Sequence, residues 1–368
     1  MSIRTEEMLL NVGPQHPSTH GVFRLKVKID GEIIHEAVPV IGYLHRGTEK
    51  IGEDLTYQQF IPLTDRLDYL NAMSGNYVWC NTVEKLMGVE VPERAEYLRV
   101  IALELNRITS HLVWWGTYLL DLGALSPFLY AFRDREYIFN MFVKLCGARM
   151  TYSYMRVGGV RYDAPEGWFS ELKELIKVLR KNFDEYDVLV SGNEIFQMRT
   201  IGVGRITREQ VIDRGLSGPI ARASGVNTDI RRIEPYSIYD RFEFDVPIRH
   251  EGDSQARYLV RLEELRQSLR IVEQALHQIE KTDPTIQAKV SRIIKPPVGE
   301  VYTRAEASKG ELGIHLVSDG SPKPYRIKLR RPSFVNVSIL PDLLIGQNIG
   351  NLIAIFGSLD IMLGEVDG

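Results

Sequence analysis

Residues 93–123, ERAEYLRVIALELNRITSHLVWWGTYLLDLG, decide the fold because they predict one long amphipathic helix. The stretch follows Pro92 and stops at Gly123, two residue types that are typical of helix boundaries. Apolar residues recur every three or four positions and share one face: Leu98, Ile101, Leu105, Ile108 and Leu112. A helix of this kind indicates a bundle, in which other helices cover the apolar face.

Similar patterns predict further long helices on both sides of this stretch. Residues 65–87 form a plausible helix before it, and another is expected to open at Pro127 and run towards Met155. Farther along, apolar residues follow a strict four–three spacing that is typical of a long bundle helix: Tyr258, Leu262, Leu265, Leu269, Val272, Leu276 and Ile279. Past Trp168, before this last helix, we expect only shorter helices and glycine-rich loops.

Both ends of the chain predict β-structure. Residues 22–30, VFRLKVKID, alternate apolar and polar side chains, Asp30–Gly31 is a hairpin turn, and residues 32–44 return as a second strand. Near the other end, three segments have the same character: GEVYTRAEAS (299–308), GIHLVS (313–318) and YRIKLR (325–330).

We therefore expect an α+β fold with a mainly helical bundle core over residues 63–281. An N-terminal β-rich element (1–62) and a C-terminal β-containing cap (282–368) flank this core. The 368 residues, 44% of them hydrophobic, are enough to bury a real core, and no repeat or low-complexity segment divides them. We expect a single domain.

Composition excludes several classes of protein. The formal net charge of −3 lacks the basic excess of nucleic-acid-binding proteins. Cys80 and Cys146 are the only cysteines, which fits a reducing compartment and rules out a disulfide framework. No run of about 18 apolar residues occurs, so any membrane role is expected to be peripheral. The start, which has no Arg/Ser-rich leader, favours a bacterial cytoplasm.

The loop NVGPQHPSTHG (11–21) places His16 and His20 four positions apart among turn-forming residues. This spacing can serve zinc, but a zinc site needs three or four ligands and no others are nearby. The imidazoles can also cap backbone groups in a turn. The third interpretation is a proton-exchanging histidine that faces a ligand.

Two helix ends carry further polar candidates. In LTDRLDYLNAM (63–73), Asp65 could simply be the N-cap of a helix, and Tyr69 could be a core residue with a satisfied hydroxyl. Asp121 lies between leucines at a helix end, where a carboxylate is unfavourable unless something pairs with it. Either this carboxylate is simply solvated at the helix terminus, or it pairs with a histidine and keeps that histidine charged or correctly oriented.

A third candidate follows the N-terminal strands. GYLHRGTEK (42–50) places His45 and Arg46 in a surface turn or aims the guanidinium at an anionic or electron-rich partner. GVGRIT (202–207) lacks the third glycine of a dinucleotide loop and is a turn, so no nucleotide site is expected.

Taken together, the motifs resemble those of one family, the D subunits of proton-pumping NADH–quinone oxidoreductase (respiratory complex I). The resemblance covers essentially the whole chain and rests on strings in order, among them NVGPQHPSTHG, IGYLHRGTEK, DRLDYLNAM, LDLGALSPF, GLSGPIARASGV and LDIMLGEVDG. The family is related to the large subunit of nickel–iron hydrogenases, so the resemblance implies a hydrogenase large-subunit-like fold.

The hydrogenase relation also supplies an alternative activity, which the cysteine count excludes. A nickel–iron centre needs four thiolates from two CxxC pairs. This chain has two cysteines, far apart, and no CxxC. We expect no bound metal and no hydrogen activation.

The resemblance implies that a quinone headgroup, ubiquinone or menaquinone, occupies the former metal cavity as the substrate. His20 matches the family position that hydrogen-bonds one quinone carbonyl, and Tyr69 matches the partner of the other carbonyl. Asp121 matches the carboxylate that pairs with the histidine. An imidazole and a phenol suit quinone reduction, because both can donate hydrogen bonds and then protons to developing oxyanions.

The electrons would come from an iron–sulfur cluster of a partner subunit, because this chain has no cysteine cluster to ligate one. Arg46 matches a family position against that terminal cluster, where its charge would raise the reduction potential. Thr151 stands where many relatives carry a histidine that links this potential to pH. Thr151 in place of this histidine predicts that the reduction potential of the cluster depends only weakly on pH. It also predicts a lower potential, which would suit menaquinone.

The resemblance further implies a peripheral subunit on the cytoplasmic side of a bacterial cell membrane. Its partners would be the cluster-bearing B subunit, the C subunit and the membrane H subunit, while NADH is used elsewhere in the complex. No activity is expected in isolation. The rival hypothesis is a purely structural scaffold, with the quinone held by a partner alone.

Overall fold

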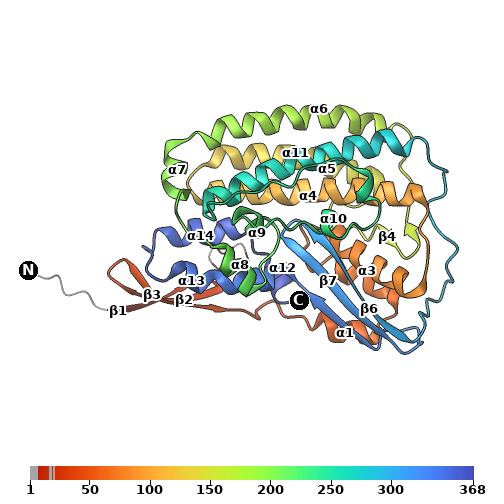
Figure 1. Ribbon diagram of the computed structural model, residues 1–368, viewed down its shortest axis with the longest axis horizontal. Coiled ribbons are helices and arrows are strands. Elements are labelled where there is room, and N and C mark those ends of the chain that lie inside the picture. The colour runs from red at the N-terminus through yellow and green to blue at the C-terminus, as the bar shows by residue number, and fades with distance from the viewer. Residues whose placement is uncertain (1–6, 16–18, 20) are drawn as a thin grey trace, which may run out of the picture.

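Four long helices pack side by side in the computed structural model of the chain, which describes residues 7–15, 19 and 21–368 (Figure 1). They are α4 (Glu93–Asp121), α5 (Leu125–Cys146), α6 (Trp168–Tyr186) and α11 (Ser254–Ile279). Helix α4 contacts α5 and α11. Helix α6 also packs against α5 and α11 and completes the bundle. The five apolar residues predicted on one face of α4 are fully buried, so the helix that decides the fold is confirmed.

Three helix predictions need correction. Helix α5 ends at Cys146 rather than near Met155, because Gly147 adopts a left-handed conformation (φ 77°) and terminates it. The helix expected from residue 65 begins only at Ala72, since the Asp68 carboxylate accepts the backbone N–H groups of Leu70 and Asn71 in a turn. Helix α6, with 19 residues, is longer than the short helices expected past Trp168.

Two antiparallel three-stranded sheets lie on one side of the bundle, below the long helices in the view of Figure 1. The N-terminal sheet comprises β1 (Glu7–Val12), β2 (Arg24–Asp30) and β3 (Ile33–Val40), and the C-terminal sheet comprises β6 (Gly299–Ala307), β7 (Gly310–Ser318) and β8 (Arg326–Arg330). A two-residue pair, β4 (Met155–Arg156) and β5 (Gly159–Val160), is separate. The predicted hairpin at Asp30–Gly31 and the α+β class are confirmed. The single-domain organisation stays a prediction.

Eleven shorter α-helices complete the described part of the chain. They are α1 (Thr48–Asp54), α2 (Tyr57–Thr64), α3 (Ala72–Met87), α7 (Glu194–Thr200), α8 (Arg208–Arg214), α9 (Pro219–Ala223), α10 (Ile230–Ile233), α12 (Pro332–Asn336), α13 (Leu340–Leu344), α14 (Asn351–Leu359) and α15 (Leu363–Val366). The buried apolar side chains form two main cores. The larger core joins the bundle to α3 and the C-terminal sheet. The smaller core joins the N-terminal sheet to α13 and α14, where the rings of Phe23 and Phe356 stack 5.0 Å apart.

The last residues of the chain, which we call the tail (residues 360–368), are buried throughout. The Asp367 carboxylate accepts the backbone N–H groups of Gly42 (2.7 Å) and Leu44 (2.8 Å), and Arg331 donates to the carbonyl of Gly368 (2.7 Å). The tail therefore joins the segment after β3 to the interior. Within the described residues, no helix has the length and apolar character needed to cross a membrane.

Candidate functional site

Tyr69 lies in the turn between α2 and α3 and is half-buried against the tail. A Cβ atom added to Gly364 would lie 3.3 Å from Cε1 of the tyrosine ring, so only glycine permits this approach without adjustment. Burial, and then the neighbouring Asp68 carboxylate, raise the pKa of the Tyr69 phenol above its usual value. The hydroxyl therefore keeps its proton at neutral pH.

Asp68 connects this turn to a buried lysine. Its Oδ2 atom lies 3.3 Å from Nζ of Lys309, which comes from the turn between β6 and β7. The same ammonium lies 3.6 Å from Oδ1 of Asp360 and donates to the Ser110 hydroxyl (3.1 Å). Burial alone would lower the pKa of Lys309, but Asp360 and Asp68 raise it, so the amine stays charged.

Asp121 is the last residue of α4 and lies beside α14. A Cβ atom added to Gly357 of α14 would lie 3.9 Å from Oδ2 of Asp121. The predicted partner His20, like His16, lies outside the described residues, so the pairing of Asp121 with His20 stays a prediction. The segment from Gly357 to Gly364 therefore borders Asp121 at one end and Tyr69 at the other.

A cavity of about 330 Å³ opens next to the end of α4. Leu119 and Leu122, on either side of Asp121, line it together with Phe196 and Arg199 from α7. Its lining is largely apolar with few polar groups, and its size lies in the range of small-molecule pockets. Asp121 itself does not line this cavity.

Arg46 lies on the exposed segment between β3 and α1, and its Nη2 donates to the carbonyl of Arg66 (2.6 Å). Partial burial, and then the charge of Arg66, lower the pKa of its guanidinium. Its neighbour His45 contacts the carbonyl of Asp367 through Nδ1 (2.7 Å). The structure thus brings the predicted Arg46 next to the turn that carries Tyr69.

The loop that carries Thr151 follows α5 and has an unusual backbone. Thr151 (φ 50°) and Ser153 (φ 44°) both adopt left-handed conformations. The N–H of Ser153 donates to Oδ2 of Asp65 (3.0 Å), and burial raises the pKa of this aspartate to about 7. Asp65 is therefore a buried partner of this loop. It follows α2 as its C-terminal cap residue and is not the N-cap of a helix.

The described residues contain no group of three histidine, cysteine or acidic side chains that could hold a metal ion. Cys80 is fully buried, and burial raises the pKa of its thiol well above the usual range. Such a thiol is a poor metal ligand.

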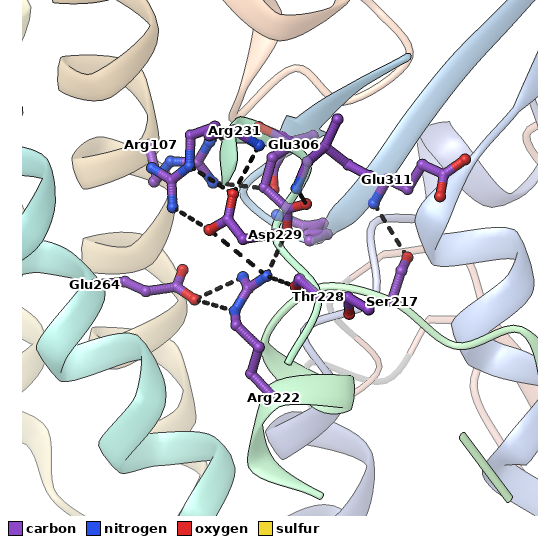
Figure 2. A network of polar contacts seen from close by, with 12 residues as sticks. Arg107, Ser217, Arg222, Thr228, Asp229, Arg231, Glu264, Glu306 and Glu311 are labelled. Atoms are coloured by element: carbon purple, nitrogen blue, oxygen red, sulfur yellow. Dashed lines mark hydrogen bonds and ion pairs between the residues drawn. The ribbon is translucent and has the colours of Figure 1, made fainter. Parts of the chain in front are cut away.

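The sequence interpretation missed a buried network of ion pairs between the bundle and the C-terminal sheet (Figure 2). Arg222 pairs with Glu264 of α11 (2.6 Å) and Glu306 of β6 (2.7 Å), and Glu264 also contacts His111 of α4 (2.9 Å). Burial alone would raise the pKa of Glu264, but Arg222 and His111 bring it well below its usual range.

The same network extends around Asp229, which pairs with Arg231 (2.7 Å). Arg231 in turn contacts Glu104 of α4 (3.1 Å). Charged residues at three- or four-residue intervals along the apolar faces of α4 and α11 were the available signal in the sequence: Glu104, Arg107 and His111, and Arg257, Arg261 and Glu264.

Comparison with known proteins adds independent evidence. The family described as "Respiratory-chain NADH dehydrogenase, 49 Kd subunit" matches residues 121–296 and 287–368. The D subunit of the NADH-quinone oxidoreductase from Geobacillus kaustophilus is 63% identical over 368 residues, and that from Bacillus cereus is 62% identical over 366 residues. Both alignments span 100% of each chain.

These matches confirm the resemblance inferred from the motifs, and the helical core with its flanking sheets fits the hydrogenase-like fold of the family. The match to the family covers most of the chain, and the relatives align with it along its whole length. The chain therefore belongs to the family of the 49 kDa subunit of respiratory-chain NADH dehydrogenase.

Proposed function

We propose that this chain forms the quinone-reduction cavity of a proton-translocating NADH–quinone oxidoreductase. His20 and Tyr69 hydrogen-bond the two carbonyls of the quinone, and Asp121 pairs with His20. The observation that carries the proposal is that one segment, from Gly357 to Gly364, borders both Asp121 and Tyr69. Two residues 52 positions apart in the chain thereby flank the same element.

The chemistry of these side chains supports the proposal. Reduction of a quinone to a quinol adds two electrons and two protons. The phenol of Tyr69, whose pKa is raised, is neutral at pH 7 and can donate first a hydrogen bond and then a proton to one oxygen. The imidazolium of His20 serves the other oxygen, and Asp121 favours its charged form. The charge change at this pair is the signal that the membrane pumps sense.

The electrons arrive from an iron–sulfur cluster of the B subunit, and Arg46 faces that cluster. The exposure of Arg46 and its contact with the Tyr69 turn support this assignment. A guanidinium there stabilises the reduced cluster and raises its potential. Thr151 in place of histidine makes the potential nearly independent of pH and low enough for menaquinone.

The subunit lies on the cytoplasmic side of the bacterial cell membrane, against the B, C and H subunits, and has no activity alone. Exposed apolar side chains beside the α4 cavity support docking onto an apolar partner. They come from the π-helix η2 (Asp187–Ser191), from α7 and from the residue after it: Val188 (85% exposed), Ile195 (70%), Met198 (75%) and Ile201 (57%).

Tyr69→Phe in the assembled complex tests the function. Loss of one hydrogen bond and one proton donor should lower quinone-reductase turnover about ten- to a hundredfold. The rate of NADH oxidation should not change when it is measured with an acceptor that takes electrons upstream of the quinone. Tyr325→Phe, at an exposed tyrosine (68%), is the matched control. Unchanged quinone turnover in a normally assembled Tyr69→Phe complex would favour the structural scaffold instead.

A further inference from the structure

Four ionisable side chains lie buried together next to Tyr69, and the proposed reaction assigns none of them a role. Lys309 contacts both Asp68 (3.3 Å) and Asp360 (3.6 Å), and Glu365 follows Gly364, the glycine that borders the tyrosine ring. All four side chains are less than 10% exposed. Burying so much charge lowers the stability of the fold unless the charges compensate one another, so such a group can indicate a function.

Glu365 is the least compensated member of this group. Its Oε2 atom accepts the backbone N–H of Ser333 (2.9 Å). Its Oε1 atom is buried and has no hydrogen-bond partner within the described part of the chain. A buried carboxylate oxygen is seldom left unpaired, so this atom indicates a protonated carboxyl or a contact with buried water.

The charges that face Glu365 explain why it retains a proton. Asp68 and Asp360 balance Lys309 and Arg261, the latter of which lies 3.7 Å from Asp360. At the rim, Arg331 donates to the Gly368 carbonyl, and Asp367 accepts backbone N–H groups of residues 42 and 44.

Among the residues that the structure describes, no cation forms an ion pair with Glu365, although the charge of the partly buried Arg331 acts on it from the rim. Burial, and then the Asp68 carboxylate, raise the pKa of Glu365 to about 7, while Lys309 opposes the shift. Its protonation accordingly changes within the physiological pH range.

We propose that Glu365 stores the proton that restores the Tyr69 hydroxyl after each quinone reduction, an inference that rests on the proposed function. In the reaction, two electrons from the partner's iron–sulfur cluster reduce the quinone. The O–H bond of Tyr69 breaks, and its proton forms an O–H bond with one quinone oxygen. His20 supplies the second proton.

The resulting tyrosine phenolate then takes the proton of the Glu365 carboxyl through buried water beside Asp68 and Lys309. The Glu365 carboxylate is reprotonated from solvent. The positive charge of Lys309 stabilises the transient phenolate, because it favours the charged form of Tyr69. Glu365 is thus a proton-storing residue behind Tyr69 and does not touch the quinone.

Glu365→Gln in the assembled complex tests the inference. The amide oxygen can still accept the N–H of Ser333, but the side chain holds no exchangeable proton. The rate of the first quinol formed per enzyme should stay the same, since Tyr69 still carries its proton. Steady-state turnover should fall about tenfold, because the hydroxyl is restored slowly. Wild-type turnover should fall as pH rises through about 7, whereas the turnover of the variant should be flat there.

Glu96→Gln is the matched control, because Glu96 is another largely buried carboxyl with a raised pKa. It lies about 20 Å along α4 from Ser110, the residue that contacts Lys309. Its turnover should match the wild type.

An equal loss in the first and later turnovers of Glu365→Gln, or no loss at all, would overturn the inference. If Tyr69→Phe is impaired in that case, the proposed function still stands. If Tyr69→Phe is also unimpaired, both fail. Should Glu365→Gln not assemble, the pH profile of the unmodified complex decides, and a flat profile between pH about 6 and 8 overturns the inference.

Discussion

At the scale of single residues, Gly364 sets the position of Tyr69. A Cβ atom at this position would lie 3.0 Å from the carbonyl oxygen of Leu67 and 3.3 Å from the tyrosine ring. Gly364→Ala should therefore push the ring or the tail aside by a few tenths of an ångström. If Tyr69 reacts with the quinone as proposed, its misplacement should lower quinone turnover about tenfold, measured in the assembled complex.

The matched control for this substitution is Gly192→Ala. Gly192 has an ordinary backbone (φ −88°) and nothing within 4 Å of an added Cβ. This variant should keep wild-type turnover. If Gly364→Ala behaves like Gly192→Ala, the contact between the tail and Tyr69 does not position the phenol.

At the scale of elements, the buried ion pairs of Arg222 join α9 to α11 and to β6. Glu264→Gln should destabilise the protein by about 3 kcal/mol, because Arg222 would lose the charge of one of its three buried carboxylate partners. The temperature at which the subunit leaves the purified complex measures this loss. Lys177→Ala, which breaks an exposed pair with Glu174, should change it little. If the two substitutions lower this temperature equally, the buried ion pairs do not stabilise the protein more than an exposed pair does.

The same substitution should have a pH signature. The pKa of Glu264 in the folded chain is well below the usual 4.5, so its stabilising effect is complete above pH 4.5 and is lost as pH falls through the lowered value. The difference between wild type and Glu264→Gln should therefore shrink on acidification.

Periodicity predicted elements well where one apolar face dominates. Helices α4 and α11 ended where their patterns ended, and the Asp30–Gly31 hairpin formed as expected. The errors came from local backbone chemistry. Gly147 stops α5 early, and the Asp68 side chain turns the chain before α3. Past Trp168 only shorter helices were expected, although Leu172, Ile176, Leu179 and Phe183 follow a helical spacing along α6 and are all buried.

At the scale of the whole molecule, the site depends on contacts between the two ends of the chain. The motifs of the family indicated Tyr69 and Asp121 as site residues, but no spacing in the sequence predicts that residues 357–364 border both. Likewise, Asp367 caps a turn more than 300 positions away. Such contacts depend on the packing of the second core, where the N-terminal sheet meets α13 and α14.

Asp367→Ala tests whether the tail holds the Arg46 segment in place. The substitution leaves the backbone N–H groups of Gly42 and Leu44 without their acceptor, which should cost about 2 kcal/mol. The complex should lose quinone-reductase activity at a lower temperature, and Asp367→Asn, which retains one acceptor oxygen, should be intermediate. Asp342→Ala, which removes an exposed partner of Arg214, is the control and should match the wild type. If Asp367→Ala also matches this control, the tail does not hold the segment. The contact with the Arg66 carbonyl would then be what positions Arg46 within this chain.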